Sequence, residues 1–190
     1  MALTKVIGSG LGAIPAISGA NLTNLDSADL TGALPAISGA SLTGFTGAQM
    51  PAGSVLQVAT AVGTSEVSWT GTNIYLGIQA SFTPTSATSK IFAIASIECA
   101  TSGTGRIQLW FRSSTESGNN VGTVQGDMYV GQPNAASTSN LMSASLTALF
   151  TAGTTSPVYV KLCSTKHDGG TGYINKIGAE TRITIMEIAV

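Results

Sequence analysis

From residue 54 to the end of the chain, hydrophobic and polar residues alternate with a period of two. In the clearest stretch, Ile74–Phe82, the large apolar residues are separated by Tyr, Gly, Gln and Ser. Since successive side chains of a strand point to opposite faces, this pattern predicts a strand with one face in a core. Similar patterns predict seven more strands, at residues 54–61, 90–100, 107–112, 123–130, 142–150, 157–163 and 181–189.

Turn-rich runs separate these strands, at residues 113–122, 131–140 and 164–172. No segment shows the 3.6-residue period of an amphipathic helix. Residues 54–190 are therefore predicted to form an all-β head domain, an antiparallel β-sandwich or jelly roll of about eight strands. The last strand, Arg182–Val190, is apolar on both faces. We expect it to lie in the middle of a sheet or to pack against another subunit.

The first 53 residues contain an internal repeat. Residues 12–23 recur as residues 32–43, with differences only at Ile14/Leu34 and Asn21/Ser41. Each copy carries Pro and Gly where a helix interior would be broken or weakened. The repeat predicts short extended pieces joined by turns.

The apolar residues of this segment are too few to stabilise it as a single chain, because ordering the backbone costs about 1–2 kcal/mol per residue. A repeat of weak units gains stability by stacking on other copies. We therefore expect residues 1–53 to be an attachment segment and stalk in which identical chains wind around one axis. The residues expected to fill that stalk are Ile14, Ile17, Leu22, Leu25, Leu30, Leu34, Ile37, Leu42 and Phe45.

Composition narrows the function classes. Only 9% of the 190 residues are charged and the net charge is −1, so the surface must be built mostly from uncharged polar groups. Eight scattered Lys and Arg form no basic stripe, which argues against nucleic acid. The longest apolar run, around Ile91–Ile97, is far shorter than the ~20 residues of a membrane span. With no secretory signal in its first residues, the chain is expected to stay in the cytoplasm until it joins a larger particle.

The sequence resembles the fibre proteins of tailed bacteriophages, especially those of marine bacteria and cyanobacteria. The resemblance is carried by the repeat at Leu34–Gly44, the linker at Gln49–Val58, the segment Phe82–Ile91 and the last strand, Arg182–Val190. It leaves residues 101–178 unmatched. It implies a homotrimer whose stalk is mounted on a tail or capsid protein of the virion and whose head meets a host glycan or protein. Since the chain is short for a complete fibre, a capsid decoration or another tail structural protein is the alternative.

Aromatic residues on the predicted polar faces are candidates for sugar binding. Trp110, Tyr75 and Tyr159 occupy such faces, and Tyr129 and Tyr173 flank predicted loops. Aromatic faces stack on sugar rings while nearby amides and carboxylates bind hydroxyl groups. Burial in a subunit interface is the competing interpretation. The residues that we predict to contact a receptor are Trp110, Asn119, Asn120, Tyr129, His167 and Asp168.

The sequence offers few groups for catalysis, and we expect no catalytic residue, no cofactor and no metal. His167 is the only histidine, next to Asp168 in a Gly-rich run, and no nucleophile elbow is present. Three copies of His167 on an axis are the single arrangement that would offer a metal site. A glycan-cleaving enzyme is the second alternative, because it needs only two carboxylates. The head has seven: Glu66, Glu98, Glu116, Asp127, Asp168, Glu180 and Glu187.

The two cysteines, Cys99 and Cys163, allow at most one intrachain disulfide. In a protein made in the cytoplasm, reduced thiols are expected. We predict that both are small buried hydrophobic residues.

Overall fold

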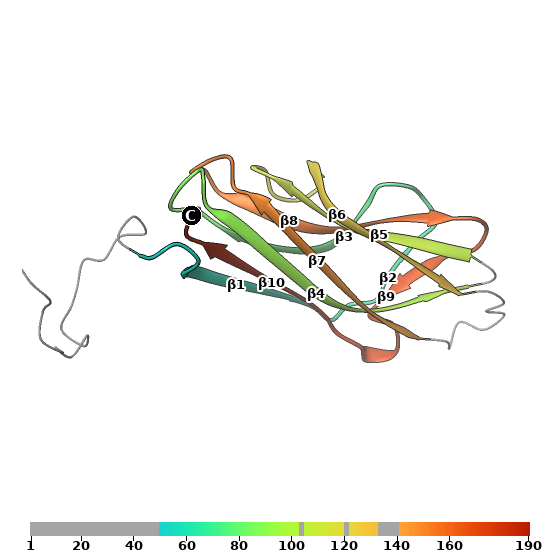
Figure 1. The fold of residues 1–190 in the computed structure, drawn as a ribbon. Coiled ribbons are helices and arrows are strands. Elements are labelled where there is room, and N and C mark those ends of the chain that lie inside the picture. The colour runs from blue at the N-terminus through green and yellow to red at the C-terminus, as the bar shows by residue number, and fades with distance from the viewer. Residues whose placement is uncertain (1–49, 103–104, 120–121, 133–140) are drawn as a thin grey trace, which may run out of the picture. The chain divides into compact units, whose positions relative to one another are not determined.

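The computed structural model describes residues 50–102, 105–119, 122–132 and 141–190. Within these ranges the chain forms ten β-strands and one short 3-10 turn, arranged as two antiparallel sheets packed face to face (Figure 1). No helix in the described ranges is long and apolar enough to cross a membrane. The predicted all-β sandwich is confirmed. The stalk residues from Ile14 to Phe45 lie outside the described residues, and the boundary between residues 53 and 54 stays a prediction.

Sheet A is centred on the last strand of the chain. This strand, β10, pairs with β1 on one edge and β4 on the other, and β4 pairs in turn with β7. Two short strands extend the sheet, because β9 pairs with the last residues of β4 and β2 pairs with β9. The bounds are β1 Val55–Gly63, β10 Thr181–Ile188, β4 Lys90–Thr101, β7 Met142–Thr151, β9 Gly172–Ile174 and β2 Val67–Trp69.

Sheet B contains the other four strands, in the order β3-β8-β5-β6. Their bounds are β3 Ile74–Phe82, β8 Val158–His167, β5 Gly105–Ser114 and β6 Thr123–Gln132. The eight long strands thus form β1-β10-β4-β7 opposite β3-β8-β5-β6, which is the strand order of a jelly roll. All eight overlap the strands predicted from the alternation of apolar and polar residues.

The core lies between the sheets and is filled by the apolar residues of each alternation. On β5, Ile107, Leu109 and Phe111 have no exposed surface, while Gln108 and Arg112 point out of the sandwich. Ile183 and Ile185 of β10 close the core from sheet A. Since β10 is flanked by β1 and β4, the first alternative for this strand, a central position in a sheet, is confirmed.

The structure departs from the sequence prediction after Cys163. Residues 164–172 were expected to be a loop, but β8 continues to His167. The reason is pairing that the residue types alone do not reveal: the four polar residues from Ser164 to His167 lie opposite β5. The 3-residue strands β2 and β9 were not predicted either, because a period of two cannot be recognised over three residues.

A buried carboxylate organises one end of the sandwich. Glu187 of β10 has no exposed surface, and its side chain accepts hydrogen bonds from the backbone N–H and the hydroxyl of Thr85, at 2.7 and 2.8 Å. It also accepts one from Nε2 of Gln57, at 2.6 Å. Burial alone would raise the pKa of Glu187, but hydrogen bonds from Ser89, Thr85 and Gln57 together lower it below its ordinary value. Glu187 thereby fixes the segment between β3 and β4.

The two ends of the sandwich are distinct. At the proximal end the chain joins β1, where the N–H of Gly53 donates to the carbonyl of Ala189 and the N–H of Ala189 donates to that of Ser54. The register places Lys90 beside Ile188 at the same end, so the connection between β3 and β4 also lies there. At the opposite, distal end β4 finishes at Thr101 and β8 at His167 (Figure 1).

Candidate functional site

Three polar side chains are linked on the outer face of sheet B, toward the distal end. Nε2 of Gln108 donates to Oδ2 of Asp127 at 2.7 Å, and Oε1 of Gln108 lies 3.1 Å from Nε2 of His167. The carboxylate can only accept, so the Gln108 amide must turn its NH₂ toward Asp127. Its carbonyl oxygen then faces His167, whose Nε2 must carry the proton. In that tautomer Nδ1 of His167 is a hydrogen-bond acceptor.

Tyr129 provides the aromatic surface of this group. Its side chain is 59% exposed, and its ring centroid lies 5.7 Å from that of His167. The register explains the meeting, because Gln108 of β5 lies opposite Tyr129 of β6 on one side and Thr165 of β8 on the other. Next to His167, Nε of Arg106 and Oδ2 of Asp168 form an exposed ion pair, with the two atoms 3.3 Å apart. We call Gln108, Asp127, Tyr129, His167 and the Arg106–Asp168 pair the distal patch.

Three of the six residues predicted to contact a receptor therefore lie together: Tyr129, His167 and Asp168. Asn119 is exposed, but it follows β5 at the proximal end and lies away from this group. Asn120 lies outside the described residues. Arg106, Gln108 and Asp127 were not predicted as contacts. Arg106 and Gln108 occupy outward-facing positions of the β5 alternation, and Asp127 lies on β6, the strand that pairs with β5. These two features together would have identified the three residues.

Trp110 is on the expected outer face, but only 6% of its surface is exposed. The guanidinium carbon of Arg112 lies 5.4 Å from the centroid of the Trp110 ring. Across the sheet, Cys163 lies opposite both Trp110 and Tyr75. These side chains form a small second packing layer on the outside of sheet B. Within one chain Trp110 thus supports the surface and does not present its ring to a ligand.

Residues 115–119 and 122, between β5 and β6, cover part of this layer. The fully buried Lys161 donates from Nζ to Oγ of Ser114 at 3.0 Å and to the carbonyl of Glu116 at 2.5 Å. Arg112 donates from Nη1 to the carbonyl of Gly122 at 3.0 Å. Burial lowers the pKa of Lys161, against the opposing influence of Cys163 and Glu116. The two cations therefore hold a covering segment in place.

Both cysteines are buried and unpaired, as predicted. Burial raises the pKa of each thiol to about 12, with Glu98 adding to the effect at Cys99 and Arg112 and Lys161 opposing it at Cys163. Since the thiolate is the reactive form, raising the pKa from 9.0 to about 12 leaves roughly a thousandfold less thiolate at pH 8.

We expect neither thiol of the native chain to react with Ellman's reagent on the timescale of minutes, and both to react once the chain is unfolded in guanidinium. Absorbance of the released thiolate measures this. A Ser117→Cys variant is the control, because Ser117 is exposed in the connection between β5 and β6 and should react at once. Rapid reaction of two thiols in the native wild-type chain would contradict the buried placement.

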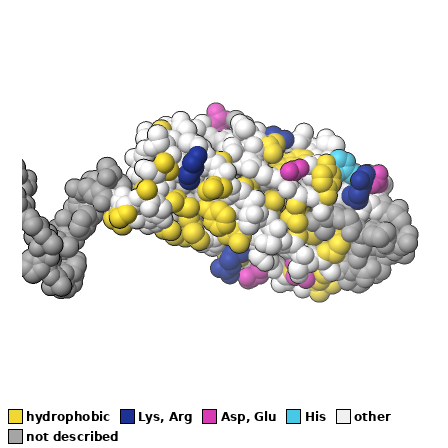
Figure 2. Space-filling view, viewed as in Figure 1, with side chains coloured by type: hydrophobic (Ala, Val, Ile, Leu, Met, Phe, Trp, Pro, Cys, Tyr) yellow, Lys and Arg dark blue, Asp and Glu magenta, His cyan; other side chains and the backbone are white. Residues whose placement is uncertain are grey.

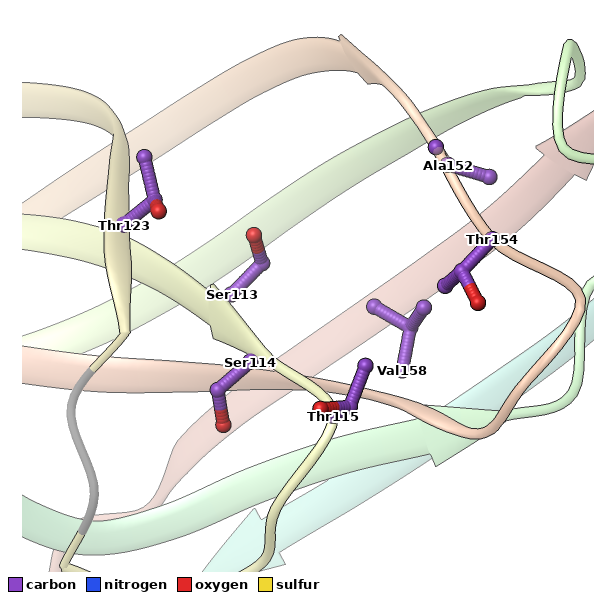
Figure 3. A pocket seen from close by; sticks show the side chains of 8 residues that line it. Ser113, Ser114, Thr115, Thr123, Ala152, Thr154 and Val158 are labelled. Carbon is purple, nitrogen blue, oxygen red and sulfur yellow. The ribbon is translucent and has the colours of Figure 1, made fainter.

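A shallow cleft of about 280 Å³ lies at the proximal end of the sandwich (Figure 3). Ser and Thr supply five of its eight lining residues, and Ala152 and Val158 supply apolar side chains. The lining residues are Ser113, Ser114, Thr115, Thr123, Ala152, Gly153, Thr154 and Val158. None of these side chains is a carboxylate, an imidazole or a thiol, so the cleft lining supplies no general acid or base.

Most carboxylates in the described ranges form a hydrogen bond or an ion pair with a nearby side chain. Asp127 is held by Gln108, Asp168 by Arg106, and Glu187 by Gln57 and Thr85. Glu180 lies 3.6 Å from Arg182, and both are exposed. The described residues contain no group of three or more His, Cys, Asp and Glu with metal-binding geometry.

Comparisons with known proteins give structural likeness only. No protein-family model matches the sequence, and no curated protein matches it. One similar structure is CsCBM6-3 from Clostridium stercorarium in complex with cellobiose, with 14% identity and a TM-score of 0.31 over 67% of this chain and 76% of that one. Another is the PRD1 vertex protein P5, with 15% identity and a TM-score of 0.31 over 72% of this chain and 99% of that one.

Proposed function

We propose that this chain is a structural component of a virus particle, a short trimeric tail fibre or spike whose sandwich domain contacts the host surface through the distal patch. The leading segment, residues 1–53, mounts the chain on a tail or capsid protein. The protein acts by binding and is not an enzyme. Jelly rolls occur in viral capsid and lectin domains, so the fold is compatible with this role without establishing it.

One observation carries the proposal. The leading segment joins the domain at the proximal end, at Met50–Ser54, and the distal patch lies toward the end where β8 finishes at His167. The exposed aromatic and hydrogen-bonding groups therefore lie at the end of the domain opposite Met50–Ser54, where a host surface can reach them.

The chemistry of the distal patch suits a glycan. An exposed Tyr129 ring can stack on the CH face of a sugar. The Asp127 carboxylate and Nδ1 of His167 can bind its hydroxyl groups. Gln108 already bonds to both Asp127 and His167, so it holds these side chains in place before a ligand arrives and less conformational entropy is lost on binding.

Binding of the labelled full-length chain to an array of bacterial surface polysaccharides tests the proposal. On a polysaccharide that the wild type binds, Tyr129→Ala should weaken binding roughly tenfold or more, as expected for an exposed aromatic anchor. Tyr159→Ala is the matched control, because Tyr159 lies on the same sheet at the proximal end, opposite Ser114. It should bind like the wild type. No binding by the wild type, or equal losses in the two variants, would count against a glycan contact at the distal patch.

The alternatives are separated by two further readouts. Release of reducing ends from a bound polysaccharide, abolished by Asp127→Asn or Asp168→Asn, would favour the glycan-cleaving enzyme. Electron microscopy of the particle distinguishes a distal fibre or spike from a capsid decoration.

Sedimentation velocity of the full-length chain should give the mass of three chains; a monomer would contradict the trimer.

A further inference from the structure

The outer face of sheet A carries a continuous apolar row across four strands. Val58 of β1 lies opposite Met186 of β10, Met186 opposite Phe92 of β4, and Phe92 opposite Leu149 of β7. Val58 is 56% exposed and Leu149 is 61% exposed. The residues before and after these on β10, β4 and β7 include the buried Ile185, Glu187, Ile91, Ala93 and Ala148. The row therefore points away from the core.

The neighbouring positions enlarge this row into a patch. The next row distally is Thr60, Thr184, Ile94 and Thr147, which has no charge. Ile188 lies on the proximal side, beside Lys90. In Figure 2 hydrophobic side chains gather over β1, β10 and β4, with a Lys or Arg side chain beside them toward the left of the view. We call Val58, Phe92, Ile94, Leu149, Met186 and Ile188 the sheet A patch.

A contiguous apolar surface of this kind marks an interaction site. Position favours a second copy of the same chain as the partner. The patch begins at Ile188, next to the point where Gly53 bonds to Ala189. The stalk predicted from the repeat would gather identical chains at this end of the domain. The net charge of −1 means that the copies hardly repel one another.

We infer that the sheet A patch is the surface through which the sandwich domains of neighbouring copies pack in the assembly. This inference rests on the proposed trimer and names its contact surface in the domain. It assigns the two outer faces separate roles: sheet A binds other copies, and the distal patch on sheet B stays free for the host surface. It also explains why the last strand is apolar on both faces.

Photo-crosslinking in the full-length chain identifies what covers the patch. With p-benzoylphenylalanine at position 149, irradiation should give a product with the mass of two chains. The same residue at position 124 is the control, because Val124 is an exposed apolar residue of sheet B, at 49%. We expect roughly tenfold more two-chain product from position 149 than from position 124. This ratio corresponds to a contact between copies that is favoured by about 1.4 kcal/mol or more. An intrachain product with residues 1–49, or no excess over position 124, would overturn the inference.

A charge substitution provides the second test. Leu149→Asp should weaken association of the full-length chain roughly a hundredfold or leave trimers in which position 92 no longer crosslinks between copies. Val124→Asp should do neither. Polysaccharide binding by Leu149→Asp, measured at concentrations where it is assembled, should remain. Wild-type polysaccharide binding that Tyr129→Ala leaves unchanged, together with crosslinking between copies from position 149, would mean that only the glycan proposal fails. Weakened binding in Tyr129→Ala without that crosslinking would mean that only the present inference fails.

Discussion

Replacing Glu187 with alanine should destabilise the sandwich domain by about 3 kcal/mol or more, because several buried donors lose their acceptor together. Gln57 and the N–H of Thr85 both donate to this carboxylate. Ser89, which also donates to it, is only 2% exposed, so water cannot easily replace the acceptor. Glu187→Gln keeps the shape but turns an NH₂ group toward donors, and should cost about 1–3 kcal/mol.

The effect should depend on pH with a definite sign. Hydrogen bonds hold the pKa of Glu187 in the folded chain below its ordinary value of 4.5. The carboxylate therefore contributes its full stabilisation above pH 4.5, and this contribution is lost as the pH falls through the lowered pKa. Since glutamine does not titrate, the difference in stability between wild type and Glu187→Gln should shrink on acidification.

Guanidinium unfolding followed by tryptophan fluorescence measures both effects, since Trp69 and Trp110 are buried in the domain. Glu180→Gln is the control, because Glu180 is exposed and pairs only with the exposed Arg182. It should change the free energy of unfolding by less than about 0.5 kcal/mol. If the difference in the free energy of unfolding between the wild type and Glu187→Gln stays constant between pH 7 and pH 3, the hydrogen-bond explanation is contradicted.

Glu187 also shows what the sequence can and cannot predict. The alternation on Arg182–Ile188 identifies the strand and its two faces, because the backbone fixes the period. It places Glu187 on the inner face, where a carboxylate looks out of place. Only the fold shows that Thr85 and Gln57, 102 and 130 residues away, supply its donors. Thr85 and Ser89, in the segment between β3 and β4, thereby hold the carboxylate.

The same distinction applies to the candidate site. The sequence predicts that Tyr129, His167 and Asp168 are exposed near loops, because the alternation along the strands and the neighbouring turn residues place them there. That they meet depends on the register between β5, β6 and β8, which the alternation does not fix. Trp110 lies on the outward face of the alternation yet is buried, and the guanidinium of Arg112 packs against its ring on the outside of the sheet.

Gly122→Ala should destabilise the domain by about 3 kcal/mol or more, through a backbone collision in that covering segment. Gly122 has φ +62°, and a Cβ there would lie 2.0 Å from the carbonyl oxygen of Ser113. A backbone atom of a paired strand cannot rotate away, so the segment itself must move. Its movement would also lengthen the hydrogen bond from Arg112 to the Gly122 carbonyl.

Gly118→Ala isolates the steric part of this effect. Gly118 lies in the same connection with φ +73°, but a Cβ there meets nothing within 4 Å. Both variants bear the left-handed backbone strain of about 1–2 kcal/mol, and only Gly122→Ala adds the collision. Guanidinium unfolding should therefore rank the wild type above Gly118→Ala, and Gly118→Ala above Gly122→Ala. Equal stabilities of the two variants would mean that Gly122 does not pack against Ser113 beside Arg112 as the structure has it.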